Sequence, residues 1–216
     1  MRDDIYNRRY FIAIAGNIGA GKTTLAQKLA LQLGWKCYLE PVIDNPYLPD
    51  FYADMSKWSF HLQVYFLSKR FQNQLEIERD ERSCVQDRTI YEDARIFANT
   101  LHRRGLMSRR DWENYQSLFS SMVSNLKKPD LVIYLHSDIE NLMQRIHQRA
   151  RYFEKSIDIE YLTELNQAYT LWKDEPQDHL LIRTIDTSNG ISENEVLAIA
   201  LQLLRQNLQI ELPFPC

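Results

Sequence analysis

Cysteine is scarce in this sequence, which holds Cys37, Cys84 and Cys216 among its 216 residues. An odd number of cysteines without paired spacing excludes the disulfide framework that stabilises small secreted domains. Cys37 and Cys84 lie in strand-like runs. We therefore expect buried thiols in a protein of the reducing cytoplasm.

An excess of positive charge is also lacking, as is any long hydrophobic run. The formal net charge is −3, so we expect no nucleic acid polymer as partner, although a local pocket could still bind a small nucleotide. No apolar run is long enough to span a bilayer, and Met1–Asp4 precede no apolar signal segment, so we expect no membrane partner and no signal peptide. The length suits a single domain over residues 1–216.

The chain does contain the pattern G-x-x-x-x-G-K-[ST], between an apolar run at residues 10–15 and a helical stripe that starts at Leu25. A strand, a glycine-rich loop and a helix in this order favour a phosphate-binding loop over an ordinary glycine-rich turn. Glycines let several backbone N–H groups face an anion, and the helix N-terminus adds its positive end. The residues predicted to contact a nucleoside triphosphate here are Gly16, Asn17, Ile18, Gly19, Ala20, Gly21, Lys22, Thr23 and Thr24.

Apolar runs and helical stripes alternate along the chain, which is typical of an α/β fold with a five-stranded parallel sheet and helices on both faces. We predict strands at residues 10–15, 36–39, 83–86, 131–135 and 179–186. The segment 44–50, rich in Pro, Asn and Asp, is predicted to be a loop. Because parallel strands bind ligands at their carboxyl ends, the strand-end residues should gather beside the phosphate loop. They are Glu40, Asp87, Arg88, His136 and Asp186, and we include Asp186 among the nucleotide contacts.

A long helix is predicted over residues 56–80. Its apolar stripe, expected to face the core, consists of Phe60, Val64, Leu67, Phe71 and Leu75. Gln63, Phe66 and Arg70 share a second face, displaced from the stripe by about 60°. This face could form the wall of a pocket, or Gln63 and Arg70 could be solvated at the edge of the core.

Two later helices begin with capping signals. Thr89 and Glu92 form a capping box, which explains Glu92 without catalysis, and Asp93 in the first turn suits the helix dipole. Ser137 and Glu140 are predicted to cap the helix that carries three arginines. Those arginines are Arg145, Arg149 and Arg151. They could be a basic helix terminus, but beside a phosphate loop they favour a lid over residues 145–155.

Phosphoryl transfer needs a held donor, neutralised charge and a group that takes the proton of the acceptor. Lys22, Thr23 and Mg²⁺ would hold ATP. Asp87, at the end of the strand beside the loop, suits a metal- or water-holding acid. Glu40 faces the expected position of the acceptor and is the predicted general base, while Arg88 and the lid arginines would stabilise charge.

The chain resembles the deoxynucleoside kinases, P-loop enzymes that phosphorylate the 5′-hydroxyl of deoxynucleosides. The resemblance covers residues 11–186 and includes segments similar to the short bacterial purine deoxynucleoside kinases. Beyond the phosphate loop it rests on Glu40-Pro41, Trp58-Ser59-Phe60…Gln63…Tyr65…Arg70, Asp87-Arg88-Thr89…Asp93 and Arg145…Arg149-x-Arg151…Glu154.

The resemblance implies a P-loop kinase fold with an arginine-rich lid, ATP and Mg²⁺ as donor and metal, and a homodimer formed through long helices. Glu40 would be the general base, Asp87 would help hold Mg²⁺, and Arg88 would contact the 5′-oxygen and the phosphate. The further residues implied at the deoxynucleoside are Tyr52 and Glu154 at the sugar 3′-hydroxyl, Gln63 at the base, and Phe66, Arg70 and Asp93 around the far end of the base pocket.

This sequence departs from the family pattern at two positions. Thr89 stands where the family usually has Ser, and it keeps the hydroxyl. Ala150 stands where the lid more often has Gly. The charged pair Arg70 and Asp93 implies deoxyadenosine or deoxyguanosine as acceptor, with deoxycytidine possible, rather than thymidine.

Two other functions would use the same phosphate loop. A nucleoside monophosphate kinase, such as a thymidylate kinase, would need extra cations at its acceptor, and Glu40 would repel the acceptor phosphate. A non-catalytic P-loop switch of the GTPase type would need an Asn-Lys-x-Asp loop, which this sequence lacks.

Overall fold

The computed structural model describes residues 8–40, 45–152, 154, 157–174 and 178–208. In this part of the chain a five-stranded sheet forms in the order β2-β3-β1-β4-β5, and all of its pairings are parallel. The strands are β1 (Phe11–Gly16), β2 (Lys36–Tyr38), β3 (Cys84–Asp87), β4 (Leu131–His136) and β5 (Ile182–Asp186). The expected α/β fold is confirmed.

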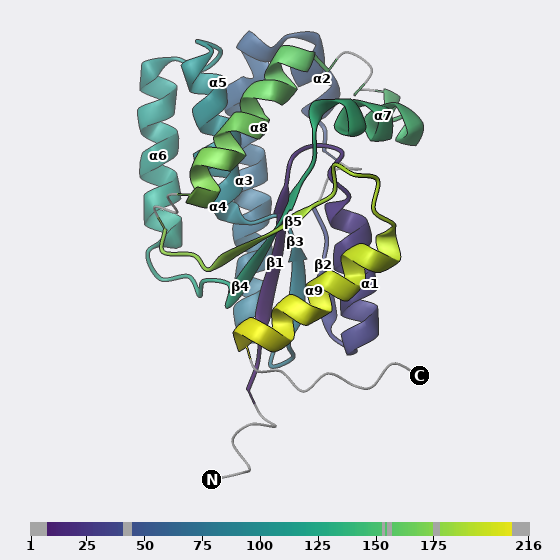
Figure 1. Cartoon of the computed structure of the whole chain (residues 1–216). Helices are drawn as coiled ribbons and strands as arrows, with labels where there is room; N and C mark the ends of the chain where they lie inside the picture. The colour runs from purple at the N-terminus through teal and green to yellow at the C-terminus, as the bar shows by residue number, and fades with distance from the viewer. Residues whose placement is uncertain (1–7, 41–44, 153, 155–156, 175–177, 209–216) are drawn as a thin grey trace.

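Helices cover both faces of this sheet (Figure 1). One face carries α1 (Lys22–Leu33) and α9 (Glu193–Leu208). The other carries α3 (Met55–Arg79), α4 (Ile90–Glu92), the π-helical segment η1 (Asp93–Ala98), α5 (Asn99–Arg103), α6 (Arg109–Val123) and α8 (Ile159–Asp174). Near the carboxyl ends of the strands lie α2 (Leu48–Ala53) and α7 (Ile139–Arg149).

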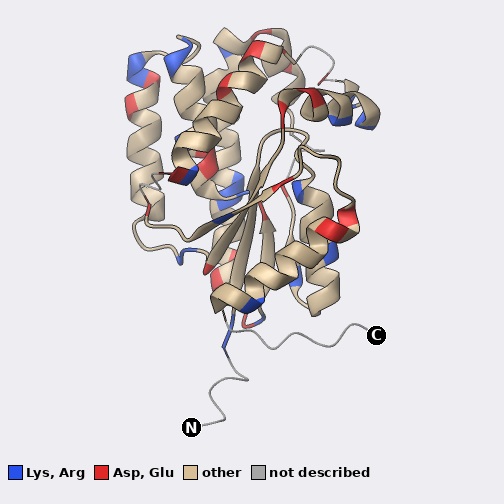
Figure 2. Ribbon diagram, in the orientation of Figure 1, with Lys and Arg blue, Asp and Glu red and all other residues tan. Residues whose placement is uncertain are grey.

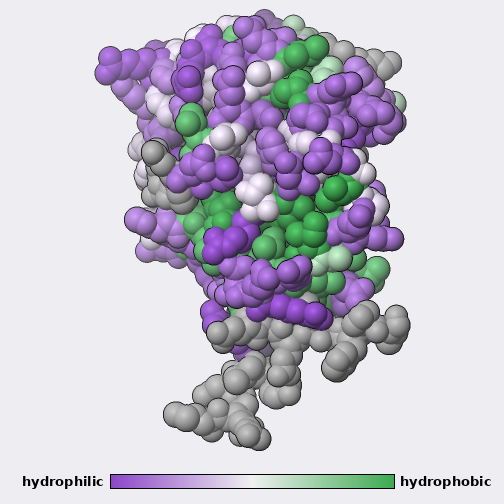
Figure 3. All heavy atoms as spheres, viewed as in Figure 1, coloured by the Kyte–Doolittle hydropathy of each residue, from purple (hydrophilic) through white to green (hydrophobic). Residues whose placement is uncertain are grey.

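Alternation along the central strands divides the buried side chains between two cores. Ile12 and Ile14 of β1 pack with α1 and α9, whereas Ala13 and Ala15 face the helices of the other layer. This is the period of two that a strand imposes, and it lets one sheet anchor both helical layers. Figure 3 shows that apolar side chains also reach the surface around β5 and α9. The exposed large apolar side chains include Leu181 and Ile199, which are 37% and 38% exposed.

The surface charges of both signs are interspersed over the outer helices in the view of Figure 2. None of the described helices combines the length and the apolarity that a bilayer crossing requires.

Cys37 is half-buried and Cys84 is buried, and both are free thiols. Burial raises the pKa of each thiol to about 11, so neither is a reactive thiolate at neutral pH. The expected burial is confirmed for Cys84 and only in part for Cys37, whereas Cys216 and Pro41 lie outside the described residues.

The predicted core stripe of α3 is wrong. Phe60, Val64, Phe71 and Leu75 are half-buried, and Leu67 alone of that stripe is fully buried. The buried side chains of α3 are Ser59, Leu62, Gln63, Leu67, Arg70, Gln74 and Ile77. Hydrophobic periodicity identified the wrong face of α3. The face that is buried contains polar side chains whose partners lie inside the protein, and a hydropathy pattern does not register such partners.

Two boundaries also differ from expectation. The helix α2 forms within the predicted loop, and Pro49 lies in its first turn, where a missing backbone N–H has little cost. The strand β5 begins at Ile182 and not at His179, whose backbone is in the left-handed region with φ +54°. Asp44 lies outside the described residues.

The cap of α7 is Asp138, not Ser137. The side chain of Asp138 accepts a hydrogen bond from the backbone N–H of Asn141 at 2.8 Å. Ser137 is buried, and its hydroxyl has no hydrogen-bond partner among the described residues. The predicted cap was one position too early because Ser and Asp are both good caps and stand side by side.

Substitutions at these two positions should separate the two assignments. Asp138→Ala is expected to lower the free energy of unfolding by about 1 kcal/mol, because α7 loses the acceptor for an N-terminal N–H group. Ser137→Ala should change that free energy by less than about 0.5 kcal/mol. Urea unfolding of both variants measures the difference, and a larger loss for Ser137→Ala would restore the original assignment.

Candidate active site

A cavity of about 670 Å³ lies at the carboxyl ends of the strands. At one end it is lined by the phosphate loop, and at the other by α3 and η1, with Glu40 and Arg88 between them. The predicted site residues in its lining are Ile18, Gly19, Ala20, Gly21, Lys22, Thr23, Thr24, Glu40, Tyr52, Gln63, Phe66, Arg88, Asp93, Arg145, Arg149, Arg151 and Glu154. The fold therefore brings most of the predicted site into one space.

The phosphate loop curls tightly at its second and third glycines. Gly19 and Gly21 have φ values of +85° and +90°, a region that glycine adopts without strain. A side chain at Gly19 would also lie 2.8 Å from the carbonyl oxygen of Leu142. Gly16 and Asn17 do not line the cavity, because the Gly16 N–H donates to Glu92 and the Asn17 amide donates to the carbonyl of Leu162. These two residues shape the loop, and their contact with the nucleotide stays a prediction.

Lys22 is the cation of this loop, and its Nζ donates to the carbonyl of Asn17 at 2.9 Å. Burial lowers the pKa of Lys22 to about 8, and the charge of Arg88 adds to the effect. Burial disfavours the charged form of Lys22. The negative charge of an incoming polyphosphate would favour that form again, so the bound anion and the ammonium group would stabilise each other.

Asp87 ends β3 beside the loop. Its Oδ2 accepts a hydrogen bond from the hydroxyl of Thr23, while its Oδ1 is buried and has no hydrogen-bond partner among the described residues. Burial raises the pKa of Asp87, and a cation would reverse that shift. A carboxylate oxygen and a hydroxyl are ligands that suit Mg²⁺, so these residues fit the metal that the motif implies.

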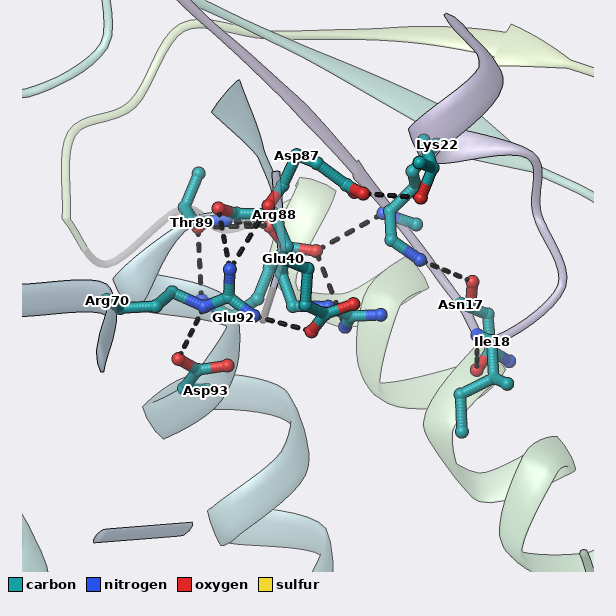
Figure 4. Close-up of polar contacts among 12 residues, drawn as sticks. Asn17, Ile18, Lys22, Glu40, Arg70, Asp87, Arg88, Thr89, Glu92 and Asp93 are labelled. Atoms are coloured by element: carbon teal, nitrogen blue, oxygen red, sulfur yellow. Dashed lines mark hydrogen bonds and ion pairs between the residues drawn. The ribbon is translucent and has the colours of Figure 1, made fainter. Parts of the chain in front are cut away.

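Glu40 meets two guanidinium groups through one oxygen (Figure 4). Its Oε1 accepts from Nη2 of Arg70 at 2.6 Å and lies 2.9 Å from Nε of Arg88. Burial alone would raise the pKa of Glu40, but Arg88, Arg70 and Lys22 outweigh it and lower the pKa to about 2. The carboxylate is therefore ionised at neutral pH.

Arg70 is fully buried and does not itself line the cavity. Besides Glu40, its Nε donates to Asp93 at 2.6 Å, and its Nη1 donates to the carbonyls of Asp87 and Arg88 at 3.1 and 3.2 Å. The pairing of Arg70 with Asp93 agrees with the resemblance. The alternative of a solvated Gln63 and Arg70 is wrong.

Asp93 starts the π-helical segment, a rare geometry that often marks functional sites. Burial raises the pKa of Asp93 to about 6, although Arg70 and Arg88 act in the opposite direction. The helix dipole alone does not account for this residue, because the carboxylate is 2% exposed and faces both Arg70 and the cavity. The sequence interpretation of Asp93 as a dipole partner was therefore incomplete.

Arg88 has a left-handed backbone conformation, with φ +70°, which is strained for a side chain with a Cβ. Its Nη1 donates to the hydroxyl of Tyr169 at 2.8 Å, and its guanidinium lies 4.3 Å from the ring centre of Phe97. These contacts aim the charge at the middle of the cavity.

The end of the cavity away from the phosphate loop is mainly aromatic and apolar. Leu62, Phe66 and Phe97 contribute to it, with Gln63 on the α3 side. The Oε1 of Gln63 is buried and has no hydrogen-bond partner among the described residues. A buried amide oxygen without a partner is costly, so a ligand that donates a hydrogen bond would be stabilised here.

The lid arginines are divided between two partners. Arg145 donates to the hydroxyl and the carbonyl of Thr187, both at 3.2 Å. Arg149 donates twice to Glu154, at 2.7 and 2.6 Å, and Arg151 once at 3.4 Å. Arg149 also lies in the last turn of α7, as the basic-terminus alternative expects, so the lid stays a prediction. Ala150, where the family more often has Gly, caps α7 in the left-handed region with φ +52°, a conformation that favours glycine.

Three predicted strand-end residues are not among those that line the cavity: Asp87, His136 and Asp186. Asp186 accepts from the backbone N–H of Ser188 at 2.9 Å, and Nδ1 of His136 lies 3.3 Å from the hydroxyl of Tyr134. The next residue after β5, Thr187, lines the cavity instead. Thr187 could have been identified from its position directly after the strand. Neighbouring residues of a strand point to opposite faces, so an error of one residue in the strand end selects a side chain on the wrong face. Gln148 was missed because nothing marked its face of α7.

Comparison with known proteins places this geometry in a family. A family model described as deoxynucleoside kinase matches residues 12–201. The chain belongs to the deoxynucleoside kinase family. The resemblance stated from the sequence is confirmed, and this kinase uses ATP as phosphate donor for a small nucleoside; the monophosphate kinase alternative is not favoured.

Its relatives include a deoxyadenosine/deoxycytidine kinase of Bacillus subtilis, 44% identical over 80% of each chain. A deoxyguanosine kinase of the same organism is 35% identical over 88% of this chain and 91% of the relative. Among solved structures, deoxyadenosine kinase from M. mycoides with bound dATP superposes with a TM-score of 0.82 at 27% identity, covering 91% of this chain and 100% of that one.

The affinity of this kinase for ATP is expected to fall as the pH rises through the pKa of Lys22, about 8. The free protein loses the ammonium charge there, whereas a bound triphosphate favours the charged form. The Kd should therefore rise up to about tenfold per pH unit above that value. Calorimetry from about pH 7 to about pH 9.5 measures this Kd. The control is Lys22→Met, which should bind ATP weakly and with an affinity that does not depend on pH. A wild-type affinity that stays constant over the range would contradict the assignment.

Proposed function

We propose that this kinase transfers the γ-phosphate of ATP to the 5′-hydroxyl of deoxyadenosine and/or deoxyguanosine, with deoxycytidine also accepted. One observation carries the proposal: a single cavity connects the phosphate loop to an aromatic acceptor end, and Glu40 and Arg88 lie between them. The names of the relatives support this range of acceptors.

In this proposal Glu40 is the general base. A pKa of about 2 keeps the carboxylate ionised, so it accepts a hydrogen bond from the 5′-hydroxyl. Such a group is a weak base toward a free alcohol. As the 5′-oxygen bonds to phosphorus, however, its proton becomes strongly acidic and passes to Glu40 late in the reaction.

Arg88 and Lys22 neutralise charge on the transferring phosphoryl group, and the lid arginines complete that role. Thr23 and Asp87 would hold Mg²⁺, since Oδ1 of Asp87 is buried without a partner among the described residues. When bound, the metal supplies positive charge at the phosphate oxygens.

We assign the acceptor contacts by the same reasoning. Tyr52 and Glu154 line the cavity near Arg149 and would bind the sugar 3′-hydroxyl. The Oε1 of Gln63, which has no partner in the part of the chain that the structure describes, would accept from an amino group of the base. Phe66 would limit the pocket, and Asp93, held by Arg70, would close its far end.

We further propose that the chain acts in the cytoplasm as a single domain with a lid over residues 145–155, and as a homodimer. The apolar face of α3 supports the dimer, because its side chains are half-buried in the monomer and pack only partly against the core. Trp112 and Met122 of α6 are half-buried in the same manner. A second copy would bury both helices.

Glu40→Gln tests the proposed base. The variant cannot take the hydroxyl proton, so kcat should fall by about 10²–10⁴-fold, while the Kd for ATP should change less than about threefold. Steady-state kinetics and calorimetry measure the two quantities, and Glu76→Gln, an exposed carboxylate on α3, serves as the matched control. Near-normal turnover would place the base elsewhere.

Gln63→Leu tests the base pocket. Loss of the amide should lower kcat/KM for the preferred purine deoxynucleoside by about 10- to 100-fold and leave the KM for ATP nearly unchanged. Gln74→Leu is a matched control, because Gln74 is buried on the same helix but donates to the carbonyl of Lys127, away from the cavity. An assay of all four deoxynucleosides with ATP measures the selectivity. If the ratios among them stay the same in Gln63→Leu, the pocket assignment is wrong.

A further inference from the structure

Glu92 is a buried carboxylate whose two oxygens face different donors. Its Oε2 accepts hydrogen bonds from the backbone N–H of Thr89 at 2.7 Å and from the Thr89 hydroxyl at 3.1 Å. The Thr89 hydroxyl accepts in return from the N–H of Glu92, so the capping box expected from the sequence is present. The cap therefore uses one oxygen of this carboxylate.

The other oxygen connects elements that are far apart in the sequence. Oε1 accepts from the N–H of Gly16, where β1 enters the phosphate loop, at 3.2 Å. It also accepts from the hydroxyl of Tyr169 on α8 at 2.7 Å, and Nη1 of Arg88 lies 3.8 Å away. Glu40 lies instead near Nε of Arg88, at 2.9 Å, and Figure 4 draws the three side chains together.

Tyr169 bridges Glu92 and Arg88. Its hydroxyl accepts from Nη1 of Arg88 at 2.8 Å and donates to Oε1 of Glu92. Its ring stacks on Tyr134 with centroids 5.4 Å apart, which fixes where the hydroxyl points. Because the backbone of Arg88 is in a strained conformation, the position of its guanidinium depends on such side-chain contacts.

We propose that Glu92 is a positioning residue for phosphoryl transfer. It holds the start of the phosphate loop, through Gly16, and the guanidinium of Arg88, through Tyr169, in one fixed relation. The inference rests on the proposed function, in which Arg88 must meet the phosphoryl group that the loop holds. Glu92 itself is 0% exposed and is not among the residues that line the cavity.

Helix capping alone does not require this arrangement. Ser192 and Glu195 make the same reciprocal cap at the start of α9, and both are exposed to solvent. A carboxylate removed from water persists only where donors and positive charge compensate it. At Glu92 the compensation comes from the phosphate loop and from Arg88. In the proposed function, the distance between the loop and Arg88 affects the rate of phosphoryl transfer. A misplacement of about 1 Å can lower such a rate by about 10²-fold.

Glu92→Gln is the direct test. The amide keeps the shape but loses the charge, and it places an N–H₂ group where an oxygen accepts. The kcat should fall at least about tenfold, while the KM values for ATP and the deoxynucleoside change less than about threefold. Tyr169→Phe removes only the bridging hydroxyl and should lower kcat by about three- to tenfold with the same constancy of KM.

Two matched controls separate positioning from general damage. Glu195→Gln alters a capping carboxylate that contacts only the start of α9 among the described residues. Tyr134→Phe removes a buried hydroxyl whose partner is His136. Both should keep kcat within about twofold of wild type. If Glu92→Gln does not fold, the kcat of Tyr169→Phe decides.

The double variant tests whether Glu92 and Tyr169 form one connection. It should be little slower than Glu92→Gln alone, because each change breaks the same link. A fully additive loss would overturn the shared link, and single variants within about twofold of wild type would overturn the proposal.

A second readout does not depend on turnover. The chain holds 6 glycines, so protein labelled with ¹⁵N-glycine gives few amide signals. Glu92→Gln should move the signal of Gly16 and leave those of Gly34, Gly105 and Gly190 in place; an unmoved Gly16 signal would overturn the proposal. If the wild-type protein phosphorylated no deoxynucleoside, the proposed function would fail, while this signal would still report on the contact with Glu92.

Discussion

Arg70 is buried at the point where four segments of the chain meet, and the site depends on its charge being compensated there. Its guanidinium contacts Glu40 after β2, the carbonyls of Asp87 and Arg88 at the end of β3, and Asp93 at the start of η1. A buried charge that lost one such partner would destabilise the fold by about 3–5 kcal/mol. These segments therefore have to be in place together.

The same contacts couple acceptor selection to catalysis. Arg70 holds Asp93, which lines the proposed base pocket, and also Glu40, the proposed base. An apolar substitution of Arg70 would thus disturb both functions at once, although Arg70 does not line the cavity. Glu92 extends this arrangement toward the donor, because it contacts Gly16 on one side and approaches Arg88 on the other. The phosphate loop, the proposed base and the proposed base pocket are therefore connected by one network of buried charges.

Local patterns predicted much of this structure. The phosphate loop, the parallel sheet, the long helix and the Thr89–Glu92 cap all follow from signals within a few residues of one another, and all are confirmed. The buried face of α3 did not follow, because Gln63, Arg70 and Gln74 are polar and only their distant partners make burial stable. The cap of α7 and the choice between Asp186 and Thr187 depended on differences of one residue, which propensity does not resolve.

The sequence by itself predicted that a triphosphate is held at a helix N-terminus, and its motifs were specific enough to identify the deoxynucleoside kinase family. The glycine backbone, the lysine ammonium group and the threonine hydroxyl lie within a few residues of one another, so a short sequence pattern is enough to identify them. The tertiary structure alone decided that Arg70 is not among the residues that line the cavity, that the N–H of Gly16 donates to Glu92, and that Glu92 reaches beyond its cap. Those facts depend on residues tens of positions apart being brought within hydrogen-bond distance, where burial makes each charge require its partner.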